Sequence, residues 1–213
     1  MPFEPFEDEA TAQGYRFIVG CDEAGRGPLA GPVVGAACYI PKHVRIHGIA
    51  DSKQLTPEKR ASVYKRLRAH KDVAVGVSVV SVAEIDEINI LQASLKAMWN
   101  AVCEIGTQVD LALIDGNKSF RCSIATKTVV GGDDRVRSIA AASIIAKVTR
   151  DEIMVKMAKH YPGYGFEKHK GYATPEHLEA LKRLGPTDQH RKSFAPVKEY
   201  LLEPLKGIVM KWN

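Results

Sequence analysis

Apolar runs and glycine-rich turns alternate at the start of the chain. The runs Tyr15–Cys21 and Val33–Ile40 are rich in β-branched and other apolar residues, which predicts two strands. A loop containing several glycines separates them, so we predict that the chain turns there and returns as an antiparallel partner. Residues 1–14 lack this pattern and are expected to form a flexible lead-in.

Strand and helix patterns alternate over the rest of the chain. Further strands are predicted at Val73–Val80, Val109–Ile114 and Ala125–Val130. Helices are predicted from Pro57 to about Lys71, from Ser81 over a few residues, and over Leu91–Ile105, Ser138–Lys159 and Pro175–Leu184. This alternation, with its early hairpin, predicts an α/β sandwich built on a mixed sheet.

Positive charge is concentrated in the last third of the chain. The net charge of the 213 residues is +5, and residues 147–213 hold 13 Lys and Arg against 8 Asp and Glu, whereas the first 146 residues hold 17 of each. A basic surface fits a polyanionic partner, although a solvated lysine-rich surface explains the same count. The N-terminus has no signal-peptide pattern, and no apolar run is long enough for a membrane span, so we expect a cytoplasmic protein.

Acidic residues follow three of the predicted strands: Asp22 with Glu23, Asp115, and Asp133 with Asp134. Ligands of α/β sheets gather at strand ends, so these carboxylates could converge. Two such charges 4 Å apart repel by about 4 kcal/mol at an effective dielectric near 20. Oxygen ligands alone favour Mg²⁺ or Mn²⁺, and a cluster of this kind can hold two ions for phosphodiester hydrolysis. Taken singly, each acid is also a common turn residue.

Neighbouring residues on a regular strand point to opposite faces. Asp22 and Glu23 can therefore serve one site only if the strand breaks or twists, and Gly25 and Gly27 make such a break plausible. A Ser–Lys nucleophile pair at Ser143 and Lys147 is disfavoured, because no oxyanion loop accompanies it.

Six motifs in this order resemble those of the ribonuclease HII family over about residues 16–200. They are the Asp22–Val33 run with its Gly-Arg-Gly, Asp51–Leu55, Ile114–Gly116, Ala141–Asp151, His169–Leu178 and Ser193–Val197. The related type 3 enzymes carry an extra N-terminal domain and lack the Gly-Arg-Gly form, so type 2 is favoured. The resemblance implies a ribonuclease H-like α/β fold, with a mixed five-stranded sheet flanked by helices and a helical C-terminal extension. The catalytic domain would span residues 15–200, followed by a C-terminal segment, 201–213.

By resemblance, the metal ligands and catalytic residues are Asp22, Glu23, Asp115 and a fourth aspartate, holding two Mg²⁺ or Mn²⁺ ions. The family usually reads Lys-Gly-Asp-Ser where this chain reads Gly131 to Asp134. Either Asp133 or Asp134 could be the fourth ligand, and the family spacing to the Ala-Ala-Ser motif favours Asp133.

The resemblance also implies the reaction. Family members cut RNA in RNA–DNA hybrids and cut 5′ of single ribonucleotides in duplex DNA, as in ribonucleotide excision repair, leaving 3′-hydroxyl and 5′-phosphate ends. A protein tells RNA from DNA through the 2′-hydroxyl and helix shape. The backbone of Gly25, Arg26 and Gly27 can approach that hydroxyl, while Arg26 and Lys53 suit phosphate contacts. In the family, the tyrosine that matches Tyr172 stacks on the sugar next to the ribonucleotide, and the alternative for Tyr172 is an aromatic residue that anchors its own loop.

Two other functions fit the sequence less well: a non-catalytic binder of structured nucleic acid, and another two-metal nuclease of the same fold. The chain is expected to be a monomer. Segment 201–213 is expected either to contact a partner in the replication machinery or to pack on the domain.

Overall fold

The computed structural model describes residues 3–49, 55–106 and 108–201. The chain divides into two compact units, each assembled from separate segments. The first comprises Met1–Ala24, Val34–Val79 and Ser94–Thr149, and the second comprises Gly25–Val33, Val80–Ala93 and Arg150–Asn213. The expectation of one catalytic domain over 15–200 stays a prediction.

The first unit contains a five-stranded mixed sheet in the order β3-β2-β1-β4-β5. Strands β1 and β2 pair antiparallel, whereas β1 with β4 and β4 with β5 pair parallel. The strands are β1 (Ile18–Ala24), β2 (Val33–Tyr39), β3 (Ala74–Val80), β4 (Leu111–Asp115) and β5 (Ala125–Val129). Both the mixed sheet and its opening hairpin are therefore confirmed.

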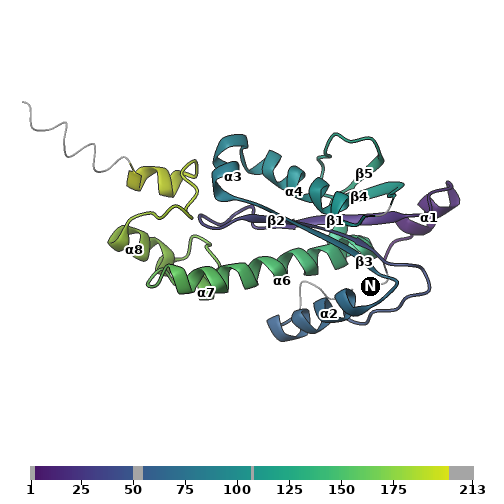
Figure 1. The fold of residues 1–213 in the computed structure, drawn as a ribbon, viewed down its shortest axis with the longest axis horizontal. Coiled ribbons are helices and arrows are strands. Elements are labelled where there is room, and N and C mark those ends of the chain that lie inside the picture. Colours follow the sequence, from purple (N-terminus) through teal and green to yellow (C-terminus); the bar gives the residue numbers. More distant parts are fainter. Residues whose placement is uncertain (1–2, 50–54, 107, 202–213) are drawn as a thin grey trace, which may run out of the picture. The chain divides into compact units, whose positions relative to one another are not determined.

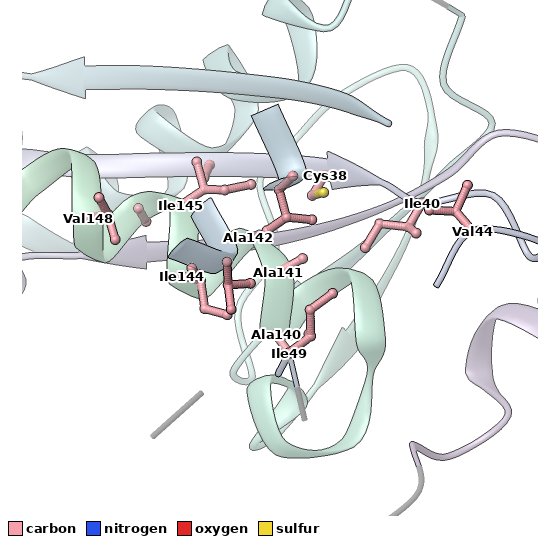
Figure 2. Close-up of a cluster of buried hydrophobic side chains, with 14 residues drawn as sticks. Cys38, Ile40, Val44, Ile49, Ala140, Ala141, Ala142, Ile144, Ile145 and Val148 are labelled. Carbon is pink, nitrogen blue, oxygen red and sulfur yellow. The ribbon is translucent and has the colours of Figure 1, made fainter. Parts of the chain in front are cut away.

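Helices cover both faces of this sheet (Figure 1). Val19 and Cys21 of β1 pack with Met98 and Ala101 of α4 (Ile90–Glu104). On the opposite face, Cys38 and other residues of β2 pack against α6 (Arg137–His160) and α2 (Pro57–Ala69), and Figure 2 shows this apolar cluster. The period-two alternation of the strands thus fills both layers of the core.

Helix α6 lies close against β1 in the first unit. A Cβ added to Gly20 of β1 would lie 2.2 Å from the backbone nitrogen of Ile139. Because Gly20 has no side chain, the helix can approach the strand to a distance that no other residue would permit. The residues after Ile139 in α6 are mostly small and buried: Ala140, Ala141, Ala142 and Ala146.

The described part of the second unit includes the C-terminal part of α6, the helices α3 (Val82–Ile88), α7 (Phe166–His169) and α8 (Pro175–Leu184), and a further helical segment at 195–201. Its described residues form apolar clusters around Leu29, Leu181 and Val197 and around Met154 and Phe166. The Thr174 hydroxyl caps α8 by accepting from the His177 N–H at 3.3 Å. No helix among the described residues has the length and apolarity to cross a bilayer.

The structure differs from the sequence-based expectation near the N-terminus. The expected flexible lead-in contains helix α1 (Phe6–Ala12). Acidic residues in its first turn favour this helix end, and Ala10 is buried in a cluster that includes Phe6 and Val136. Burial of these side chains explains why a short segment with no clear periodicity becomes ordered.

Candidate active site

Asp22 lies within strand β1, where it pairs with Ala36 of β2. Its carboxylate is buried, with 7% of the residue exposed. Burial raises the pKa of Asp22 well above its usual value, and the charges of Glu23 and Asp115 raise it further. A hydrogen bond from Ser143 of α6 acts in the opposite direction. Asp22 is thus a buried acid whose ionised form is opposed by two neighbouring acids.

Glu23 follows Asp22 on the same strand and pairs with Gly35. The strand continues to Ala24 and its antiparallel pairing with β2 extends equally far, so β1 does not break at Asp22. A twist of the strand is therefore the alternative, of the two that the sequence analysis named, by which Asp22 and Glu23 could serve one site. Successive side chains on such a strand alternate between faces. The backbone N–H of Glu23 nevertheless donates to Asp22 Oδ1 at 2.7 Å, and the charge of the Glu23 carboxylate raises the pKa of Asp22.

Asp115 ends strand β4, which neighbours β1 in parallel. The pairing runs as far as Cys21 with Ile114, and Asp22 and Asp115 are the next residues on the two strands. Asp115 Oδ1 accepts a hydrogen bond from the Gly132 N–H at 2.7 Å. Partial burial raises the pKa of Asp115, the Gly132 N–H lowers it, and the charge of Asp133 raises it.

Asp133 and Asp134 lie in the short helix α5 (Gly132–Arg135), after β5. Asp133 is half-buried and Asp134 is exposed. The charge and the backbone N–H of Asp133 both act on Asp115. Gly132 fits between its neighbours because a Cβ there would lie 2.6 Å from Ile139 Cδ1. The glycine that this chain shares with the family motif therefore has a packing reason in the first unit.

These acids are close enough for their charges to act on one another. Glu23 and Asp115 raise the pKa of Asp22, and Asp133 raises the pKa of Asp115. Among the described residues, however, no group of three or more His, Cys, Asp or Glu side chains is arranged to hold an ion. The donor set does fit a hard divalent cation, because it consists of carboxylate groups. Burial and neighbouring like charges raise the pKa of Asp22 and of Asp115, so both carboxylates would gain from a nearby cation.

Ser143 is a site residue that the sequence analysis did not assign to Asp22. It lies on α6, half-buried, and hydrogen-bonds the Asp22 side chain. The apolar character of the surrounding helix hides this role, since one polar residue among buried ones is common. The close approach of α6 to β1, which Gly20 permits, is the signal that could have revealed it.

The predicted substrate-binding residues that the structure describes lie in the second unit. Gly25 is buried with a φ of +106°, whereas Arg26 and Gly27 are exposed. Tyr172 is 44% exposed, and a Cβ added to Gly27 would lie 3.7 Å from its Cε1. The structure therefore brings Gly27 and Tyr172 together. Lys53 lies outside the described residues.

Comparisons with known proteins agree on one family. The sequence profile of the family "Ribonuclease HII" matches residues 19–197. The chain is similar to Ribonuclease HII of Chlamydia muridarum (strain MoPn / Nigg), with 52% identity over 93% of this chain and 91% of that protein.

Solved structures give the same picture of the fold. The crystal structure of ribonuclease H2 from Pyrococcus horikoshii OT3 matches with a TM-score of 0.74 and 26% identity, covering 90% of this chain and all of that one. The structure of Bst-RNase HIII in complex with Mn²⁺ matches with a TM-score of 0.65 and 19% identity, over 89% of this chain and 70% of that one.

Proposed function

Since the chain belongs to the ribonuclease HII family and is therefore a ribonuclease H, we propose that it cuts both RNA–DNA hybrids and DNA duplexes that contain single ribonucleotides. In this proposal the cut falls 5′ of the ribonucleotide and leaves 3′-hydroxyl and 5′-phosphate ends. A role in ribonucleotide excision repair follows from cutting at isolated ribonucleotides, because that incision marks the strand for replacement.

The observation that carries the proposal is the placement of Asp22 and Asp115. They follow the last paired residues of two adjacent parallel strands, and each acid is opposed by a neighbouring acid's charge. Carboxylates in this arrangement are stable as anions when a divalent cation neutralises them. The proposed ligands are Asp22, Glu23, Asp115 and Asp133, the last supported by its influence on Asp115.

The ribonuclease H family depends on divalent metal ions, and the RNase HIII neighbour was solved in complex with Mn²⁺. We propose Mg²⁺ or Mn²⁺, two ions per chain. When bound, such ions polarise a phosphate and lower the pKa of water. The chain's own carboxylates position the ions, while Ser143 donates to Asp22 and fixes the orientation of that carboxylate.

Recognition of the ribonucleotide is assigned to Gly25, Arg26, Gly27 and Tyr172 in the second unit. Arg26 and Gly27 are exposed, so a nucleic acid can reach this part of the loop. The Tyr172 ring is next to Gly27 and partly exposed, which suits stacking on a sugar. Lys53 is kept as a proposed phosphate contact. A monomer, a cytoplasmic location and a replication-machinery contact through 201–213 also stay predictions.

The test uses a DNA duplex with one central ribonucleotide, a long RNA–DNA hybrid, and an all-DNA duplex of the same sequence. With Mg²⁺ or Mn²⁺, the protein should cut the first two and leave the third intact, and EDTA should stop cleavage. Mapping the ends of the products then checks the position of the cut. Salt-sensitive binding without any cleavage would instead support the non-catalytic binder, and cutting of the all-DNA duplex would support a general nuclease.

A further inference from the structure

Two arginines of the second unit, Arg150 and Arg191, are almost completely buried, with 1% and 0% of each residue exposed. Buried arginines are rare unless their donors are satisfied. Arg150 opens the second unit's part of α6, and Arg191 follows α8 in the chain. The sequence analysis gave neither residue a role in recognition.

Arg191 donates to four carbonyl groups of the segment 25–32. Its Nη2 bonds Gly25 O at 2.6 Å and Gly31 O at 2.8 Å, with a longer contact of 3.3 Å to Pro32 O. Its Nε also bonds Gly31 O, and its Nη1 bonds Arg26 O, both at 3.0 Å. One side chain thus holds both ends of this segment, hereafter the glycine loop (residues 25–32).

Arg150 connects the glycine loop to the segment that carries Tyr172. Its Nε donates to Pro32 O at 3.0 Å and its Nη2 to Ala30 O at 3.1 Å. Its Nη1 donates to Lys170 O at 3.0 Å, and its guanidinium lies 6.0 Å from the centroid of the Tyr172 ring. The backbone adds a further link, since the Leu29 N–H donates to Gly171 O.

The contacts of Arg191 determine where the peptide groups of the glycine loop point. In a trans peptide, the carbonyl of one residue and the N–H of the next point in opposite directions. The carbonyls of Gly25 and Arg26 point to the buried Arg191. The N–H groups of Arg26 and Gly27 therefore point away from it, in the exposed part of the loop.

We propose that Arg191 and Arg150 are positioning residues for ribonucleotide recognition: Arg191 aims the N–H groups of Arg26 and Gly27, and Arg150 sets Tyr172 against the glycine loop. This inference rests on the proposed function of that loop. Lysine cannot replace either residue, because an ammonium lacks the planar fork of five donors that reaches several carbonyls at once.

Charge supports the same assignment. Burial and the nearby charge of Arg150 lower the pKa of Arg191 to about 9, so Arg191 remains cationic at neutral pH. Burial also lowers the pKa of Arg150, but a guanidinium keeps its proton in proteins. The hydrogen bonds of these two side chains given above all end on backbone carbonyls. The charges of Asp86 and Asp151 favour the cationic forms of Arg191 and Arg150, and a cationic guanidinium keeps all its N–H donors for these carbonyls.

The test compares Arg191→Lys and Arg150→Lys with Arg183→Lys, a control on an exposed arginine of the same unit that donates to Gly163 O. KM and kcat are measured on the DNA duplex with one ribonucleotide, and the inhibition constant of the all-DNA duplex is measured in the same assay. A positioning role predicts that KM for the ribonucleotide duplex rises toward that inhibition constant, with kcat/KM about a hundredfold lower, while the control stays at wild type.

A purely structural role gives a different result, because partial unfolding lowers kcat per total protein and leaves KM unchanged. Unchanged KM in both lysine variants would overturn the inference, even if their melting temperatures fell. If Arg191→Lys yields no folded protein, Arg150→Lys decides the question on the same readout. Failure of the wild-type protein to cut any ribonucleotide duplex would refute the proposed function instead, so the two failures are distinguishable.

Discussion

Gly25 and Gly27 flank Arg26, and alanine should change a different property at each position. Gly25→Ala should lower the stability of the protein, whereas Gly27→Ala should lower its activity. At Gly25 the backbone has a φ of +106°, and an added Cβ would lie 2.2 Å from Arg150 Nε. At Gly27 the φ is not positive, and the nearest atom to an added Cβ is Tyr172 Cε1 at 3.7 Å. The first methyl group clashes within the protein, whereas the second fits.

The magnitudes follow from these contacts. For Gly25→Ala, the left-handed backbone alone costs about 1–2 kcal/mol, and displacement of the Arg150 guanidinium adds to this. Gly27→Ala should leave the free energy of unfolding within about 1 kcal/mol of wild type, because restriction of the unfolded chain even favours alanine. If a nucleic-acid backbone approaches Gly27 closely, the methyl group displaces it, and kcat/KM falls about a hundredfold.

Two measurements separate these effects: urea unfolding of each variant, and kcat/KM on the DNA duplex with one ribonucleotide. The expected pattern is a Gly27→Ala variant of near wild-type stability whose kcat/KM is about a hundredfold lower, and a destabilised Gly25→Ala. Full activity of a folded Gly27→Ala would refute the reasoning, since it would show that the substrate does not need the space beside this residue. Wild-type stability of Gly25→Ala would refute the packing argument.

Three further predictions follow from the site. Asp115→Asn should lower the cleavage rate about a thousandfold or more at saturating Mg²⁺ yet keep duplex binding by fluorescence anisotropy, and a variant that cuts at the wild-type rate would exclude Asp115 as a ligand. If Asp133 is the fourth ligand, Asp133→Asn should weaken activation by Mn²⁺ far more than Asp134→Asn, and the reverse order would reassign it. Burial and the charge of His177 help lower the pKa of His190 to about 4; its unfolded value lies near 6.5, so the unfolded state binds more protons between these pH values. The free energy of unfolding should therefore fall by up to about 3 kcal/mol as pH drops through that window, and His190→Gln should flatten this slope in urea unfolding.

The sequence predicted the sheet well because its strands are short and apolar with clear turn residues between them. The hairpin of β1 and β2 followed from the two apolar runs and the intervening glycines. The helix start at Pro57 followed from Thr56, whose hydroxyl accepts from the Lys59 N–H at 3.4 Å. Such local signals need no knowledge of distant contacts.

The features that sequence reasoning missed depend on contacts between distant segments. Helix α1 forms because its apolar side chains meet Val136, which lies more than 120 positions away. Arg191 binds carbonyls of the glycine loop about 160 positions earlier in the chain. Every residue has a backbone carbonyl, so the sequence does not show which carbonyls accept hydrogen bonds from a side chain. An arginine buried against such carbonyls therefore cannot be distinguished in the sequence from an arginine on the surface.

The placement of Asp22 has a cost for the fold that a last variant can measure. The pKa of Asp22 in the folded state lies above the unfolded value of 3.8, so above pH 3.8 the folded state binds more protons than the unfolded state. The free energy of unfolding therefore falls as the pH rises from 3.8 through the pKa of the folded state. Asp22→Asn removes the charge while its amide oxygen can still accept from Ser143. In EDTA at pH 7.5 the variant should therefore be more stable than wild type, although it should not cut. Adding Mg²⁺ should stabilise wild type alone and narrow this difference. A less stable Asp22→Asn in EDTA would show that the carboxylate is held by favourable contacts, and that its neighbours do not oppose its charge.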